Sequence, residues 1–124
     1  MPDQSVKNDL ILVIEHINEI ENYFEEINSP NDFVMDKPGK AFFDAILMHL
    51  QVIGELLKKS YSLNEPLFLK YDKIPWSEII RMRDLISHHY DKLQHDIVFD
   101  ICKNALPDLK SCLQQIIKEQ FPSN

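Results

Sequence analysis

The chain has 124 residues, of which 44% are hydrophobic and 27% charged, proportions typical of a globular core with a solvated exterior. Only two glycines occur, Gly39 and Gly54, which excludes a glycine-rich phosphate loop and disfavours a turn-rich all-β fold. The net charge of −7 argues against a protein that coats nucleic acid through a field of lysines and arginines, so any RNA contact must be local. We therefore expect one domain over residues 1–124.

The cysteines and the hydropathy pattern indicate a cytoplasmic protein. Cys102 and Cys112 are the only cysteines and lie ten residues apart in one helical pattern, or about 15 Å along a helix. They are too far apart to form a disulfide within one subunit. No apolar run is long enough for a membrane helix, and no basic stretch followed by an apolar one opens the chain. We expect no membrane contact.

Apolar residues recur at steps of three and four in four segments, which predicts four amphipathic helices. The second has the widest apolar face, which favours a central position or a subunit interface. Pro107 should kink the fourth helix, because proline lacks a backbone donor and crowds the carbonyl four residues earlier. The fold class is therefore all-α, an antiparallel four-helix bundle with a kinked last helix. The expected helices are 5–28, about 38–61, 75–90 and 96–118, with a loop at 62–74 that includes a short helical turn near 67–71.

A run in the third helix carries the chemistry: Arg83-Asp84-Leu85-Ile86-Ser87-His88-His89-Tyr90. An arginine can neutralise a phosphate through two hydrogen bonds, and a histidine can transfer a proton at neutral pH. On an ideal helix Arg83 and Ser87 share a face, Tyr90 lies near it, and His88 lies about 140° away. Arg83 and His88 can meet on one phosphate if the helix loosens near residue 88, if the arginine side chain swings round, or if a second subunit completes the site.

Each of these side chains also has a structural interpretation. Arg83 alone is typical of a surface cation paired with Asp84 or Glu78. His88 alone is typical of a histidine near a helix C-terminus, where the helix dipole favours positive charge. Trp76 is more typical of a core residue than of a ligand-stacking ring. Their combination is what indicates a functional site.

The pattern Arg83-Asp84-x-x-x-His88-x-Tyr90 resembles the Arg-x4-His-x-Tyr signature of HEPN-domain toxins. It is most similar to the HepT-like proteins, the partners of MNT nucleotidyltransferases in prokaryotic toxin–antitoxin pairs. Three further segments, in the expected order, look like landmarks of the same family. They are Ile53-Gly54-Glu55, Ile74-Pro75-Trp76 and Leu106-Pro107-Asp108-Leu109.

Two positions depart from the family pattern. Asp84 follows the arginine where asparagine is common, and its negative charge can pair with Arg83. His89 stands between the histidine and the tyrosine where a small residue is common, which leaves two imidazoles for one role. We assign the catalytic role to His88 on spacing and keep Asp84 and His89 as auxiliary candidates.

The resemblance implies a HEPN-type bundle that forms a symmetric homodimer and acts as a metal-independent endoribonuclease, the toxin of a type VII-like system. Arg83 and His88 are the implied catalytic residues. Tyr90 matches the tyrosine that the cognate MNT nucleotidyltransferase modifies with AMP. The implied partners are that antitoxin and an RNA substrate, for which tRNA and mRNA are candidates, with no DNA and no cofactor.

The chemistry can be reasoned independently of the resemblance. RNA supplies its own nucleophile, the 2′-hydroxyl, so the protein needs only a base, an acid and a cation at the phosphate. His16, His49 and His95 are too scattered in the sequence to suggest a metal site. Two alternatives stay open: a noncatalytic adaptor that binds a nucleotidyltransferase or its substrate, and a bundle that only dimerises.

Overall fold

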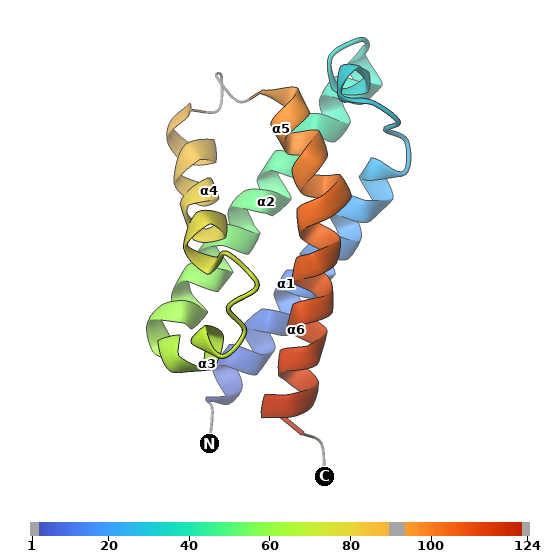
Figure 1. The fold of residues 1–124 in the computed structure, drawn as a ribbon. Coiled ribbons are helices and arrows are strands. Elements are labelled where there is room, and N and C mark those ends of the chain that lie inside the picture. Colours follow the sequence, from blue (N-terminus) through green and yellow to red (C-terminus); the bar gives the residue numbers. More distant parts are fainter. Residues whose placement is uncertain (1–2, 90–93, 123–124) are drawn as a thin grey trace.

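The computed structural model describes residues 3–89 and 94–122, apart from the side chains of residues 88 and 89, and this part of the chain is helical without any strand (Figure 1). The all-α prediction is confirmed. A 3-10 turn, η1 (Pro30–Phe33), and a π-helical segment, η3 (Ile101–Ala105), accompany the α-helices. The α-helices are α1 (Gln4–Phe24), α2 (Lys37–Leu63), α3 (Glu65–Leu69), α4 (Trp76–His89), α5 (His95–Asp100) and α6 (Leu106–Gln120).

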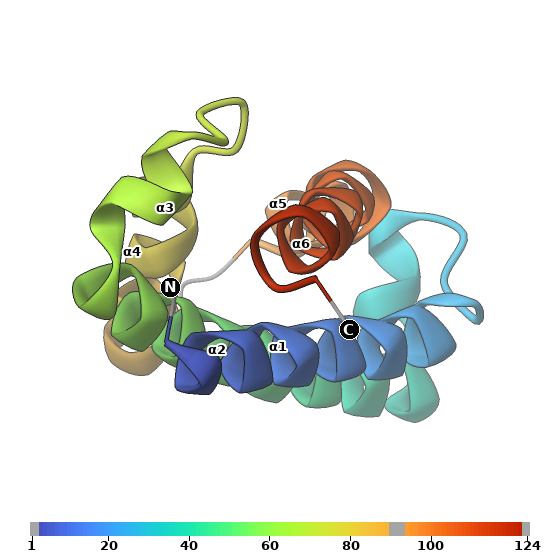
Figure 2. The same cartoon turned by 90° about the horizontal axis from the view of Figure 1, so that it is seen from below.

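Helix α2 is the centre of the bundle, because it packs against both α1 and α4. Viewed along the bundle, α1 and α2 form one layer, and α4 lies with the α5–η3–α6 unit in the other (Figure 2). The unit formed by α5, η3 and α6 acts as the fourth long helix. The predicted central position of the second helix is therefore confirmed.

Local sequence explains where the helices begin. Asp36 caps α2, since its Oδ1 accepts a hydrogen bond of 2.8 Å from the backbone N–H of Gly39. Pro38 occupies the first turn of α2, where its missing donor costs nothing. Helix α4 begins directly after Pro75, as predicted, while α1 ends at Phe24, four residues before the predicted end.

The irregularity predicted at Pro107 takes the form of a π-helical segment. Segment η3 ends at Ala105, two residues before the proline, and α6 starts at Leu106. The proline ring would crowd the carbonyl of Lys103, which lies inside η3. A wider π-helical turn relieves this crowding without ending the helix.

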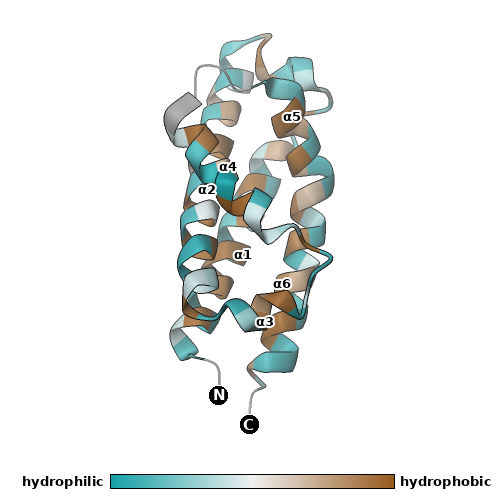
Figure 3. Ribbon diagram, turned by 60° about the vertical axis from the view of Figure 1, so that its left-hand side comes forward, coloured by the Kyte–Doolittle hydropathy of each residue, from teal (hydrophilic) through white to brown (hydrophobic). Residues whose placement is uncertain are grey.

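Side chains from every long helix form one hydrophobic core, and apolar and hydrophilic residues alternate along the helices in Figure 3. Trp76 anchors the start of α4 in this core and is only 5% exposed. Its indole Nε1 donates to the carbonyls of Phe68 and Tyr71, both at 3.0 Å, and its ring meets Phe68 edge-on at 4.9 Å. Trp76 is therefore a core residue, as predicted.

Cys102 and Cys112 are both free, and burial raises the pKa of the Cys102 thiol to about 12.

Among the helices in the described part of the chain, none combines the length and the apolar character that crossing a membrane requires.

Candidate active site

Helices α2 and α4 approach each other closely where Gly54 faces Arg83. A Cβ atom added to Gly54 would lie 2.6 Å from the Cβ of Arg83 and 3.4 Å from its Cα and N. Non-bonded carbon atoms prefer separations of about 3.5–4.0 Å, so only glycine allows this approach. Gly54 thus sets the position of the Arg83 backbone on the surface of α2.

The guanidinium of Arg83 emerges from this contact next to two carboxylates. Its Nη1 donates to Oδ1 of Asp84 at 2.9 Å, and its Nε donates to Oε1 of Glu55 on α2 at 3.4 Å. The Arg83 side chain is 31% exposed. The predicted pairing with Asp84 is confirmed, whereas the second partner is Glu55 and not Glu78. Exposed ion pairs of this kind contribute little to stability, so an incoming phosphate can replace them.

A buried side chain and a hydrogen bond to α2 fix the second half of α4. Ile86 is 5% exposed and belongs to the core, and Gln51 Nε2 donates to Oγ of Ser87 at 3.1 Å. Ser87 directly precedes His88, so the hydrogen bond from Gln51 holds the backbone just before this histidine against α2.

The structure places the other predicted site residues only in part. Residues 88 and 89 belong to α4, but their side chains lie outside the described part, and Tyr90 lies outside it altogether. Because the backbone stays α-helical through His89, Arg83 and His88 are about 140° apart around α4 and about 7.5 Å apart along it. The helix does not loosen before His88, so that alternative loses its support.

Two histidines that are far apart in the sequence lie side by side in the structure. His16 on α1 and His49 on α2 meet with their Nδ1 atoms 2.9 Å apart, although they are 33 residues apart in the chain. Burial lowers the pKa of His49, the nearby His16 lowers it further, and Glu19 opposes the shift. The antiparallel pairing of α1 with α2 creates this contact, and no local sequence pattern indicates it.

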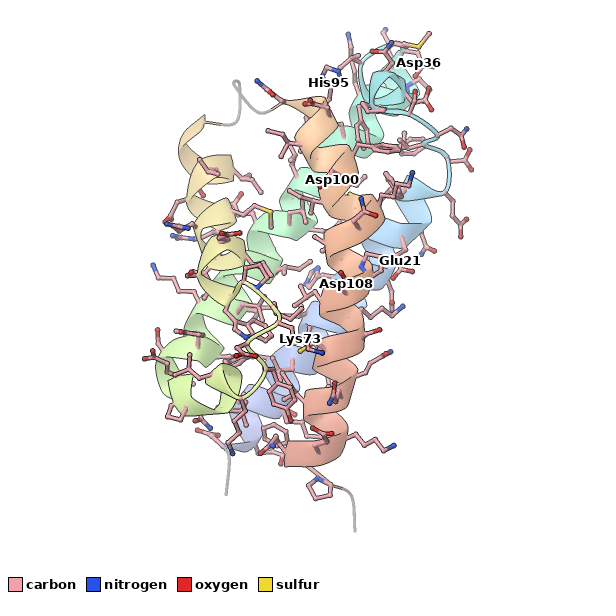
Figure 4. The ribbon with its side chains drawn as sticks, in the orientation of Figure 1. Glu21, Asp36, Lys73, His95, Asp100 and Asp108 are labelled. Carbon is pink, nitrogen blue, oxygen red and sulfur yellow. The ribbon has the colours of Figure 1, made fainter. Side chains whose placement is uncertain are left out.

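Other described parts of the molecule offer no metal cluster but do contain a cavity. In the described residues, no three or more His, Cys, Asp and Glu side chains gather where they could hold a metal ion. A cavity of about 730 Å³ lies between the segment 70–74 and α6, and Figure 4 labels Lys73 and Asp108 in its two walls. Arg83 is not among its lining residues, so it is separate from the Arg83 site.

Comparison with known proteins identifies the family. Residues 13–116 match the family model described as "Ribonuclease HepT-like". "Putative RNase MJ0127" of Methanocaldococcus jannaschii is 30% identical over 96% of this chain and 93% of its own length. "Probable ribonuclease HepT" of Thermococcus cleftensis is 33% identical over 93% of this chain and 98% of its own length. No solved structure gives a significant match. The chain therefore belongs to the HepT-like ribonuclease family.

Proposed function

We propose that this protein is the toxin of a HEPN/MNT toxin–antitoxin pair and cleaves RNA as a metal-independent endoribonuclease. The observation that carries the proposal is the placement of Arg83, a partly exposed cation fixed by Gly54 on the helix that continues to His88. Membership of a ribonuclease family and relatives named as ribonucleases support it.

The mechanism uses the 2′-hydroxyl of RNA as the nucleophile. His88 removes the proton from this hydroxyl or gives one to the leaving 5′-oxygen, and a second imidazole takes the complementary role. Arg83 stabilises the negative charge that develops on the phosphorane. To do so, its guanidinium leaves Asp84 and Glu55 for the phosphate, an exchange that these partly exposed ion pairs permit. Because the nucleophile comes from the substrate, cleavage should persist when a chelator is present.

Variants on α4 test the catalytic assignment. Arg83→Ala and His88→Ala should each lower RNA cleavage at least about a hundredfold, the loss typical of a positioned proton-transfer group. The matched controls are Arg81→Ala, which removes an exposed arginine two residues away on the same helix, and His89→Ala. Full cleavage by His88→Ala protein would refute the assignment. If His89→Ala is the inactive variant, the two histidines exchange roles.

We also propose that the active form is a symmetric homodimer with a shared cleft. Met48 on α2 and Leu85 on α4 are 68% and 51% exposed, large values for apolar side chains. A groove of about 460 Å³ runs between these helices, and Met48 is one of its walls. Its lining residues are Asp44, Leu47, Met48, Gln51, Ile86 and Ser87. A partner bound here would cover apolar surface and lie next to His88.

Light scattering tests the dimer, with Met48→Lys and Leu85→Lys expected to give monomers. Met35→Lys is the control, because Met35 is 72% exposed but lies before α2, outside this groove. A monomer at micromolar concentration for the unmutated protein would exclude the dimer. Mixing inactive Arg83→Ala and His88→Ala proteins should raise cleavage above that of either variant, because one site of each mixed dimer keeps both Arg83 and His88. The rate should stay below that of the unmutated protein, because the mixed dimer lacks the second imidazole.

Control by AMP transfer is proposed for Tyr90. An added phosphate near Arg83 would occupy the cation that binds RNA. Co-expression with the cognate nucleotidyltransferase should add the mass of AMP and block cleavage, while Tyr90→Phe should escape both. Tyr61 and Tyr71 are internal controls, because their hydroxyls already donate to Glu65 and Glu119. Modification of either one instead, or equal protection of Tyr90→Phe, would replace this proposal with simple sequestration.

One observation favours the second candidate, a noncatalytic adaptor for a nucleotidyltransferase. Arg83 is paired with two carboxylates, as an ordinary surface cation would be. An adaptor would bind its partner equally well without Arg83 and would cleave no RNA, so the cleavage assay on the unmutated protein separates the two functions.

A further inference from the structure

A second group of cations lies beside Arg83, on the far side from His88. The register of α2 against α4 establishes this order, because Gln51 contacts Ser87 while Gly54 contacts Arg83. Moving toward the C-terminus of α2 therefore means moving toward the N-terminus of α4. A groove of about 500 Å³ opens in that direction. Its lining residues are Glu55, Lys58, Lys59, Ser62 and Arg83.

The lining residues from α2 follow one face of that helix. They occur at positions i, i+3, i+4 and i+7 starting from Glu55, the spacing at which helical side chains lie above one another. Three cations and one carboxylate thus surround the groove. Carboxylates lie against Arg83 and Lys59, so the cation that distinguishes this groove for an anion is the remaining lysine, Lys58.

The two lysines of the groove are held differently. Lys59 Nζ lies 3.2 Å from Oδ2 of Asp9, a carboxylate on α1 with a 9% exposed side chain, although the geometry is not that of a hydrogen bond. This ion pair ties Lys59 to α1 while its side chain stays 60% exposed. Lys58 is exposed and forms no ion pair with any residue in the described part of the chain. Lys58 is thus available to a ligand without loss of an existing contact.

We infer that this groove is a second phosphate subsite, in which Lys58 binds the phosphate adjacent to the one that Arg83 holds. The inference rests on the proposed ribonuclease function and deepens it by giving the RNA strand a path along α2. Lys58 is four residues beyond Gly54, or about 6 Å along the helix axis, a distance comparable with that between successive phosphates of a single strand. Lys59 and Ser62 complete the walls of the subsite.

Binding of a short, fluorescein-labelled single strand tests this inference. The strand carries 2′-O-methyl groups, which prevent cleavage, so fluorescence anisotropy measures the Kd of the unmutated protein over a series of salt concentrations. Loss of one phosphate contact lowers the slope of log Kd against log salt by about 0.7 for a single strand. We expect this decrease for Lys58→Gln and recovery of the slope for Lys58→Arg.

Lys40→Gln is the matched control, because Lys40 is an exposed lysine in the first turn of the same helix. If Lys58→Gln changes the slope no more than Lys40→Gln does, the subsite is refuted and the proposed function stands on its cleavage assay. If the unmutated protein neither binds the strand nor cleaves RNA, the proposed function fails and the subsite fails with it.

Discussion

Replacing Gly54 with alanine should separate α2 from α4 at the Arg83 site. The new Cβ would lie 2.6 Å from the Cβ of Arg83, so the helices must move apart by about 1 Å to reach an ordinary carbon contact. Overpacking of this kind costs about 1–3 kcal/mol. Alanine returns up to about 1 kcal/mol through its higher helix propensity. The net loss of stability should therefore be between about zero and 3 kcal/mol.

The effect of Gly54→Ala on activity should be larger than its effect on stability. A displacement of about 1 Å in a group that contacts the reacting phosphate can lower the rate by as much as about a hundredfold. Chemical denaturation measures the stability change, and single-turnover cleavage of RNA measures the change in rate. A folded protein with markedly slower cleavage would show that Gly54 acts by positioning Arg83.

A second substitution isolates the contact itself. In an Arg83→Gly background the clashing Cβ is absent, so Gly54→Ala should cost less stability there than in the unmutated protein. Equal effects in both backgrounds would contradict the proposed clash. So would a Gly54→Ala protein that is about 1 kcal/mol more stable and fully active, the result expected for a glycine at an open helical site.

Three further predictions follow from the contacts of single residues. Glu55→Gln should strengthen RNA binding severalfold in the anisotropy assay, because it removes a negative charge 3.4 Å from the Arg83 guanidinium. Trp76→Phe should lower the free energy of unfolding by about 1–3 kcal/mol in chemical denaturation, since it removes the two hydrogen bonds of the indole N–H and part of a buried ring. The pKa of His49 is lower in the folded state than the ordinary 6.5, so the unfolded state binds the proton more readily. The contribution of neutral His49 to stability is therefore fully present above pH 6.5. It is lost as the pH falls from 6.5 through the lower pKa of the folded state. Denaturation curves for His49→Gln should show a weaker dependence on pH in that range.

Helix positions were predictable because each depends on local pattern and local capping. The step of three and four between apolar residues identifies every long helix, and Pro38 and Pro75 mark where α2 and α4 begin. The π-helical form of η3 was not predictable in the same way. Pro107 requires some relief of crowding, but sequence alone does not distinguish a kink from a wider turn.

The contacts of the site were less predictable, because they depend on which helices pack together and in what register. Arg83 was chosen from its spacing to His88, and its pairing with Asp84 is a neighbour effect along one helix. Its pairing with Glu55 requires that α4 lie antiparallel on α2 in one register. Gly54 was recognised only as a family landmark, and its physical role appears once Arg83 lies against it.

The geometry of α4 connects the catalytic proposal to the proposed dimer. Arg83 faces α2, and the backbone position of His88 lies about 140° from that of Arg83 around the helix. A twofold axis beside Leu85 and Met48 would bring the second copy of α4 close to the first and let Arg83 of one subunit share a phosphate with His88 of the other. The same arrangement gives the two imidazoles that separate acid and base roles require. A monomeric site would instead need the arginine side chain to bend around its own helix to reach the same phosphate as His88. Dissociation of the dimer should therefore abolish cleavage even when every residue of the Arg83 site is intact.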